Sequence, residues 1–374
     1  MMVKIRIACI VLGLMMPTTW AGQQPALCQA DYDWRDGIEA GFLEGRGFKE
    51  PKLSYARLPD RFKDTVTSNV WNLSRSSIGF CARFSTDSSE IAVRWRVPKD
   101  VDSGALLTYV QFAGIDVYSR SEEGGWQHVS AGAPNRKSGE GELRLKWNSG
   151  SECLIYLPAR ASVLGFSVGV RKGASFSAPR AHCLKKPIVH YGTSIVNGSC
   201  ASRSGLALPA IMGRLVDMEV INLGFSGSGK MELQMADLVA EIDASLYLID
   251  CEWNMDRNLI AANYEPFVRR LKELRPDVPV LLCGACTERT VPRETETLSR
   301  RIFERLQAAS PEKWSNWQYL SGVGMLPVDS DCTLDHCHPN DWGFAQMGRV
   351  YADAVRKILR LKVSKVAENQ QEVK

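Results

Sequence analysis

A serine with small neighbours follows a short apolar run in the middle of the chain. The run from Ile188 to Tyr191 leads directly into Gly192-Thr193-Ser194-Ile195. This pattern predicts a strand that ends just before a helix, and such a turn presents a serine hydroxyl at the edge of a sheet. In that position Ser194 can act as a nucleophile if a base removes its proton during attack.

A base and a carboxylate stand close together near the other end of the chain, between Asp335 and His338. Imidazole titrates near neutral pH, so His338 is suited to take the proton of Ser194. Asp335, three residues earlier, can orient the ring and stabilise its charged form. His336 is the alternative base and Asp331 the alternative carboxylate. These residue types predict a Ser-His-Asp relay that works through an acyl-enzyme.

The oxyanion of such a reaction needs fixed hydrogen-bond donors. Gly227 lies in the Gly- and Ser-rich stretch 222–229, and Asn254 follows the next apolar run along the chain. We expect an oxyanion hole made of the backbone N–H groups of Ser194 and Gly227 and the side-chain amide of Asn254. Arg203 is a weaker candidate, for gripping an acidic or hydroxylated substrate. A surface or loop-pinning role for it is an equal alternative.

The elements that would position these residues form an alternating series. From residue 187 onward, apolar strands alternate with amphipathic helices, which predicts a parallel sheet covered on both faces. Ligands bind at the carboxyl ends of the strands in such sheets. The expected strands are 187–191, 219–223, 245–250, 278–283 and 317–320, and the expected helices are 205–216, 232–242, 264–274, 294–309 and 342–361.

The region before residue 173 indicates β-structure. Ile91, Val93 and Trp95 alternate with polar residues, and 142–147 repeats the pattern, which is typical of strands with one buried face. Further short apolar runs at 106–117 and 153–157 are separated by turns rich in Ser, Asp and Gly. Many short strands of this kind predict an all-β, jelly-roll-like sandwich.

Other reactive residues lack a supporting pattern. The stretch 165–169 fits the G-x-S-x-G expression, but no amphipathic helix follows it, so we interpret it as a sandwich strand. His128, His182 and His190 have no partner pattern and are expected to be structural. The chain has 11 Cys, including a C-x-x-C at 283–286. Buried thiols or local disulfides are the favoured interpretation there, with a redox or zinc site as the alternative.

The N-terminus has the pattern of a secretory signal. Lys4 and Arg6 precede the short apolar run 7–16, and a small-residue cleavage site ends at Ala21. The expected location is periplasmic or secreted, with no membrane span after cleavage; an uncleaved anchor is the alternative. The net charge is only +4 and the basic residues are scattered, so no nucleic-acid partner is expected.

The predicted organisation has five parts. These are a signal peptide at 1–21, a jelly-roll-like β-sandwich domain at 30–172, a linker at 173–186, an α/β domain with the candidate catalytic residues at 187–362 and a disordered tail at 363–374. The expected fold class is therefore α/β, with the all-β domain in front.

The motifs resemble those of a known family. Gly192-Thr193-Ser194-Ile195, Gly227, Asn254 and Asp335-x-x-His338-Pro339 resemble the four blocks of the SGNH, or GDSL-like, hydrolases, although the first block reads Gly-Thr-Ser-Ile instead of Gly-Asp-Ser-Leu. Gly114-Ile115-Asp116-Val117-Tyr118 resembles the Gly-x-Asp-Leu-Tyr signature of the N-terminal module in a bacterial branch. The resemblance implies a three-layer hydrolase domain with a central parallel sheet.

The same resemblance implies ester hydrolysis without metal or cofactor. The expected substrate is a small acyl group, most simply acetyl, on a carbohydrate or polysaccharide. Two alternatives stay open at this point. One is a lipase or thioesterase of the same fold, and the other is a glycan-binding protein with a vestigial hydrolase domain.

Overall fold

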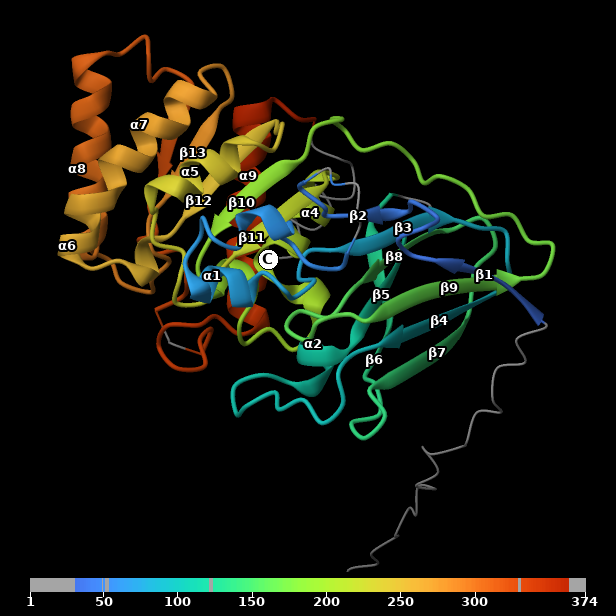
Figure 1. Ribbon diagram of the computed structural model, residues 1–374. Helices are drawn as coiled ribbons and strands as arrows, with labels where there is room; N and C mark the ends of the chain where they lie inside the picture. Colours follow the sequence, from blue (N-terminus) through green and yellow to red (C-terminus); the bar gives the residue numbers. More distant parts are fainter. Residues whose placement is uncertain (1–30, 49, 51–53, 121–123, 329–330, 363–374) are drawn as a thin grey trace, which may run out of the picture.

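The N-terminal part of the molecule is a sandwich of two antiparallel sheets, drawn from blue to green in Figure 1. The computed structural model describes residues 31–362, apart from 49, 51–53, 121–123 and 329–330. One sheet has the order β1 (Tyr32–Asp36), β9 (Gly165–Arg171), β4 (Glu90–Arg96) and β7 (Glu140–Lys146). The other has the order β2 (Leu43–Glu44), β3 (Cys81–Ser85), β8 (Glu152–Tyr156), β5 (Ile115–Arg120) and β6 (Trp126–Gly132).

The alternating residues of β4 form part of the sandwich core. Ile91, Val93 and Trp95 are buried together between the sheets, which confirms the predicted face. The stretch 165–169 lies inside β9, so its serine pattern belongs to a strand, as predicted. The run at 106–117 differs from the expected strand, because it begins with helix α2 (Tyr109–Ala113), which Thr108 caps, before β5 starts.

A five-stranded parallel sheet forms the second half of the molecule. Its order is β11 (Val220–Gly224), β10 (Ile188–Gly192), β12 (Leu246–Asp250), β13 (Val280–Cys283) and β14 (Trp317–Leu320). The helices of this half are α3 (Ser194–Asn197), α4 (Leu208–Val216), α5 (Leu233–Ala240), α6 (Arg257–Leu259), α7 (Glu265–Leu274), α8 (Glu294–Ala309) and α9 (Asp341–Leu359).

Helices cover both faces of this sheet. Alternate strand residues such as Tyr191 and Tyr247 share a core with α5, α7 and α8. Leu246 and Leu248 belong to a separate core with α4 and α9. The result is the predicted three-layer α/β arrangement. All five expected strands and all five expected helices are present, with ends that differ by a few residues.

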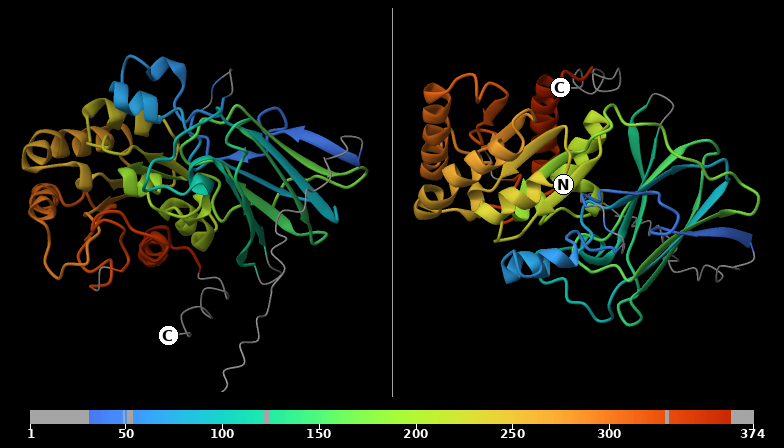
Figure 2. Two further views of the ribbon diagram at one scale, coloured as in Figure 1. Left: turned by 90° about the horizontal axis from the view of Figure 1, so that it is seen from below. Right: turned by 45° about the horizontal axis from the view of Figure 1, so that its top comes forward.

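One N-terminal segment runs from the sandwich core, where Tyr55 is buried, onto the helical half. Residues 55–78, with η2 (Asp60–Phe62) and α1 (Ser68–Leu73), lie against the helical half, as both views of Figure 2 show. Phe62 and Val70 are part of the core that contains α5 and α7. Arg57 is fully buried there and donates to the carbonyl of Gly224 at 2.7 Å. Burial lowers the pKa of this guanidinium to about 9.

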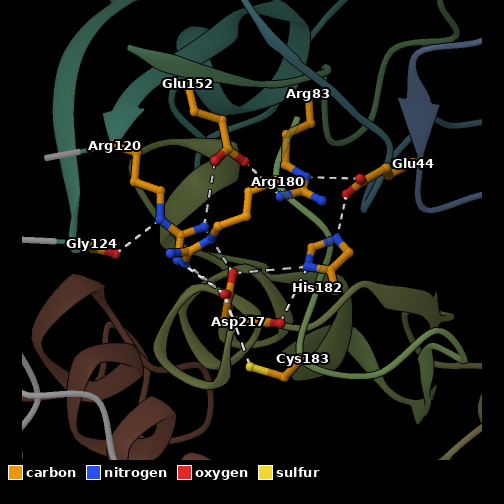
Figure 3. A network of polar contacts seen from close by, with 9 residues as sticks. All are labelled: Glu44, Arg83, Arg120, Gly124, Glu152, Arg180, His182, Cys183 and Asp217. Carbon is orange, nitrogen blue, oxygen red and sulfur yellow. Dashed lines mark hydrogen bonds and ion pairs between the residues drawn. The ribbon is translucent and has the colours of Figure 1, made fainter. Parts of the chain in front are cut away.

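A network of charged groups joins the two halves (Figure 3). Arg120 of β5 forms a bidentate pair with Asp217, which follows α4, at 3.0 Å to each oxygen. His182, in the connecting segment, lies 2.9 Å from Glu44 of β2 through Nε2. Arg83 of β3 closes the network by pairing with Glu44 at 2.8 Å. The connecting segment is therefore anchored to both halves.

The sequence signature at 114–118 lies in the same interface. Asp116 is buried and accepts hydrogen bonds from Arg203 at 2.7 Å and from the Gly205 N–H at 3.0 Å. A Cβ at Gly205 would lie 2.5 Å from the ring of Tyr118 and 2.6 Å from Asp116, so only glycine fits. The aspartate and the tyrosine of the signature thus hold the loop that follows α3.

Some predicted features fall outside the described residues. The signal peptide at 1–21 and the tail at 363–374 are among them. Among the described helices, none has both the length and the apolar character needed to span a bilayer.

Candidate active site

Ser194 is the first residue of α3, directly after the tight turn that ends β10. Thr193 caps the helix, because its Oγ1 accepts the N–H of Ile195 at 3.2 Å. A Cβ on Gly192 would lie 2.3 Å from the carbonyl oxygen of Asp250, so the turn requires glycine. The turn places the Ser194 hydroxyl at the carboxyl edge of the parallel sheet.

His338 and Asp335 meet Ser194 from the loop before α9. Nε2 of His338 lies 2.8 Å from Oγ of Ser194, and its Nδ1 lies 2.8 Å from Oδ2 of Asp335. The other carboxylate oxygen, Oδ1, accepts the backbone N–H of His338 at 2.7 Å. With the ring proton on Nδ1, Nε2 is an acceptor for the serine hydroxyl. The three predicted residues are therefore in one hydrogen-bonded chain.

The alternatives weighed from the sequence take no part in this chain. His336 is exposed and forms no hydrogen bond with any described residue. It stands at φ +61°, a left-handed conformation that turns the chain between Asp335 and His338. The carboxylate of Asp331 likewise forms no hydrogen bond or ion pair with a described residue, while its backbone carbonyl accepts from the side chain of Asn340.

The pKa of Asp335 is lowered from its ordinary value. Burial acts to raise it, but the hydrogen bonds from the backbone and ring of His338, and the charge of that ring, outweigh burial. Asp335 is therefore ionised at neutral pH and can stabilise an imidazolium on His338.

The loop after β11 approaches Ser194 from a second side. The N–H of Phe225 donates to the carbonyl of Gly192 at 2.9 Å, which ties this loop to the end of β10. Gly227 is exposed and left-handed, with φ +66°, and a Cβ on it would meet no atom within 4 Å. The N–H groups of Ser194 and Gly227 donate to none of the described residues, so both are open to a ligand.

Asn254 extends from the short η4 (Glu252–Asn254) after β12. The hydrogen bonds around the amide assign its orientation: Oδ1 accepts from the N–H groups of Ser228 and Gly229, at 3.1 and 3.2 Å. In that orientation the Nδ2 group faces away from these two donors. The predicted donor is thus held by the same loop that carries Gly227.

Replacing Asn254 tests the third donor. Asn254→Ala should lower kcat for an ester by about 10²–10³-fold, because an oxyanion-hole donor acts mainly in the transition state. Asn254→Asp keeps the shape but cannot donate when ionised, so it should be no more active than the alanine variant. Steady-state kinetics on p-nitrophenyl acetate measures both. An unchanged kcat in Asn254→Ala would remove this residue from the oxyanion site.

Arg160, from the sandwich, reaches the same loop. Its Nη2 donates to Oγ of Ser226 at 2.7 Å and to Oγ of Ser199 at 2.5 Å. Burial lowers the pKa of Arg160 to about 10. Ser226 directly precedes Gly227 in the chain, so the sandwich supports the loop that presents one expected oxyanion donor. The sequence carries no signal for this contact, because Arg160 and Ser226 belong to different halves of the molecule.

Removing Arg160 should disturb the loop and leave the relay intact. Arg160→Ala should lower kcat by about 10-fold or more with little change in KM, since a hydrogen bond to a charged group contributes roughly 1.5–3 kcal/mol. Arg160→Lys, which can still reach one hydroxyl, should recover part of the loss. Arg94→Ala is the control, because it removes a half-buried sandwich arginine that pairs with Glu142 of β7 instead of this loop. Equal kcat in Arg160→Ala and wild type would show that the contact has no bearing on the loop.

The guanidinium of Arg203 is already paired with a side chain of the sandwich. This group donates to the buried carboxylate of Asp116 at 2.7 Å. The structure thus gives it the loop-pinning role that was its alternative in the sequence.

Glu252 is a buried carboxyl that the sequence analysis missed. It accepts hydrogen bonds from the hydroxyls of Tyr319, at 2.7 Å, and Ser299, and from the N–H of Ala285. Burial raises its pKa to about 7; the two hydroxyls oppose this rise, and nearby Glu296 adds to it. Glu252 starts η4, so it holds the segment that carries Asn254. Nothing in the pattern around it distinguishes it from a surface acid.

The raised pKa has a consequence for stability. An unfolded Glu titrates near 4.5, so the neutral folded form stabilises the protein below that pH, and this contribution is lost as pH rises through about 7. Glu252→Gln stays neutral throughout. The melting temperature of Glu252→Gln relative to wild type should therefore rise between pH 5 and pH 8. The corresponding change in the free energy of unfolding is at most about 3 kcal/mol. A difference that does not change with pH would contradict this.

Cys283 and Cys286, the two cysteines of the C-x-x-C, are free thiols. Cys283, Cys286 and Cys332 are buried, in line with the buried-thiol interpretation of the C-x-x-C. Within the described residues, one group has metal-ligand atoms close together, namely Asp335, Cys337 and His338, within 4.8 Å of one another. Both ring nitrogens of His338 are already taken up by the relay. The geometry is therefore that of a proton relay.

Family models match both halves of the chain. Residues 185–360 match the GDSL-like lipase/acylhydrolase family, and residues 32–176 match the N-terminal module of SGNH hydrolase-type esterases. A protein described as a GDSL-like lipase from Bacteroides ovatus is 30% identical, with a TM-score of 0.77, over 89% of this chain and 100% of that one. The chain belongs to the GDSL-like, or SGNH, hydrolase family and is an ester-hydrolysing enzyme. The resemblance stated from its motifs is thereby confirmed.

More distant structures share the fold. The salicylyl-acyltransferase SsfX3 from a tetracycline biosynthetic pathway is 18% identical, with a TM-score of 0.68, over 89% of this chain and 98% of that one. A family two carbohydrate esterase from Cellvibrio japonicus is 12% identical, with a TM-score of 0.58, over 88% and 98%. At these identities the likeness concerns the fold alone. None of the curated proteins compared with the chain matches it.

Proposed function

We propose that the protein is an exported serine esterase that removes small acyl groups, most simply acetyl, from carbohydrate. The observation that carries the proposal is the hydrogen-bonded chain from Ser194 through His338 to Asp335. In the proposed reaction Oγ of Ser194 attacks the ester carbonyl while His338 takes its proton. The same imidazolium then protonates the leaving alcohol.

The acyl-enzyme completes the cycle. Water attacks the acyl carbonyl, His338 accepts the water proton and then returns it to Oγ, and the carboxylic acid leaves. In both steps the N–H groups of Ser194 and Gly227 and the amide of Asn254 would hold the oxyanion. Every group in this scheme belongs to the chain itself, so the proposed mechanism uses no metal or cofactor.

The choice of substrate has separate support. The family of the chain hydrolyses esters, and solved structures with the same fold include family two carbohydrate esterases. Lys4, Arg6 and the apolar run after them support export, which would bring the enzyme to polysaccharides outside the cytoplasm. The vestigial alternative is disfavoured because each group that the chemistry needs is present.

Two measurements test the proposal. Purified enzyme should release acetate from acetylated polysaccharides and should hydrolyse p-nitrophenyl acetate much faster than p-nitrophenyl octanoate. A preference for octanoate would favour the lipase alternative. For export, the mass of protein recovered from the periplasm or medium should correspond to a chain that starts at Gly22. Recovery of the uncleaved chain from the membrane fraction would favour an anchor.

A further inference from the structure

A cavity of about 500 Å³ lies next to the Asp335–His338 pair, because Sγ of Cys337, one of its lining residues, is within 4.8 Å of ligand atoms of both. Trp253, the neighbour of Asn254, forms one wall, and Cys337, the neighbour of His338, forms another. The cavity is therefore bounded by residues adjacent to two of the proposed reacting groups. Its volume lies in the range of small-molecule sites. A substrate whose ester reaches Ser194 has room there for one further unit.

Two arginines in this cavity have no hydrogen-bond or ion-pair partner among the described residues. Arg289 and Arg293 line it, and neither side chain forms a hydrogen bond or ion pair with a described residue. Nη1 of Arg293 is buried without an acceptor. Its guanidinium lies over the ring of Trp253, 3.9 Å from the centroid, and the indole N–H donates to the carbonyl of Cys286 at 3.1 Å. The stacking holds the guanidinium in a fixed plane while its donors stay unused.

One carboxylate shares the cavity. Glu288 lines the wall, and its Oε2 is buried without a donor in the described part of the chain. The imidazole of His336 is also part of the wall. With two guanidinium groups against one carboxylate, the lining carries an excess of positive charge at neutral pH. It offers unused donors for an anion and an unused acceptor for a hydroxyl.

We infer that this cavity binds a carboxylated sugar unit of the substrate, so that the enzyme prefers acidic over neutral acetylated saccharides. The inference rests on the proposed function. Arg293 and Arg289 receive the sugar carboxylate, because a guanidinium matches a carboxylate in shape and charge. Glu288 accepts hydrogen bonds from sugar hydroxyls. The acidic unit thereby fixes the position of the neighbouring ester at Ser194.

Acetylated oligogalacturonate and its methyl ester provide a matched pair of substrates, since they differ only in whether each carboxyl is a charged acid or a neutral methyl ester. Wild type should release acetate from the free acid with a kcat/KM about tenfold or more above that for the methyl ester. Raising the salt concentration should reduce this ratio. Arg293→Gln should bring the ratio close to one, and Arg289→Gln should lower it. Arg300→Gln removes a charge from α8 outside the cavity and should keep the wild-type ratio.

The result that would overturn the inference is a wild-type ratio near one, or a ratio that survives in Arg293→Gln. Failure of the proposed function would look different, since neither saccharide would release acetate. The cavity can still be tested in that event. Calorimetry with Ser194→Ala should then detect tighter binding of galacturonate than of galactose, and the difference should be lost when Arg293→Gln is added. Equal binding of the two sugars would also reject the site.

Discussion

Ser194→Ala is expected to lower kcat for p-nitrophenyl acetate by about 10³–10⁶-fold, the range seen when a serine nucleophile is removed. Without Oγ no acyl-enzyme can form, and only the oxyanion donors and substrate binding remain. The Ser194 side chain contacts His338 on the open edge of the sheet and fills no core, so the melting temperature should change little. Steady-state kinetics and thermal melts measure the two effects.

Ser167→Ala is the matched control. Ser167 stands in the other serine pattern of the chain, at 165–169, but within β9 of the sandwich. The Ser167→Ala variant should keep full activity and should still react with a fluorophosphonate probe, whereas Ser194→Ala should not react. Labelling of Ser194→Ala at the wild-type level would place the nucleophile elsewhere and end the esterase mechanism described above.

His338→Ala should be the second most damaging change, with kcat lowered by about 10³-fold or more, because the serine then has no base. Added imidazole should restore part of the activity, since the small molecule can occupy the vacated space between Ser194 and Asp335. The neighbouring variant His336→Ala should retain most of the wild-type rate on this small ester, because His336 is exposed and forms no hydrogen bond with Ser194 or Asp335.

The two histidine variants separate the possible bases. A nearly inactive His336→Ala with an active His338→Ala would reassign the base and would require the loop before α9 to rearrange. If both variants lost activity equally, the cause would be a change in the conformation of the loop before α9, because that conformation depends on the left-handed backbone of His336. Rescue by imidazole in His338→Ala alone is the outcome that fits the observed geometry.

The parallel sheet could be predicted because each of its elements carries a local pattern. The strand 246–250 begins with four apolar residues in succession, and the helix 265–274 has its apolar residues on one side. These patterns depend on neighbours three or four residues away. By contrast, the packing of residues 55–78 on the helical half could not be predicted from neighbouring residues. Phe62 and Val70 have the apolar character of core residues, but nothing in the sequence around them indicates which half they pack in.

The same distinction applies to the site. Ser194, His338 and Asp335 could be named because their types and order match a reaction, and Asp335 and His338 are three residues apart. Arg160 and Glu252 could not, since one acts across the domain interface and the other is significant only because burial changes its protonation. For Arg203 the sequence left substrate binding and loop pinning as equal alternatives, and only the structure reveals its pair with Asp116 across the two halves.

The packing of residues 55–78 on the distant sheet imposes an order on biosynthesis. This segment emerges early from the ribosome or the export channel, yet Nη1 of Arg57 finds its two carbonyl partners on β11, more than 150 residues later. Contacts so far apart in the chain form slowly, because a long loop must close first. The aromatic residues of the early segment therefore stay exposed to solvent until the strands later in the sequence have emerged. A chain that stalls after the sandwich would present that surface to chaperones and proteases.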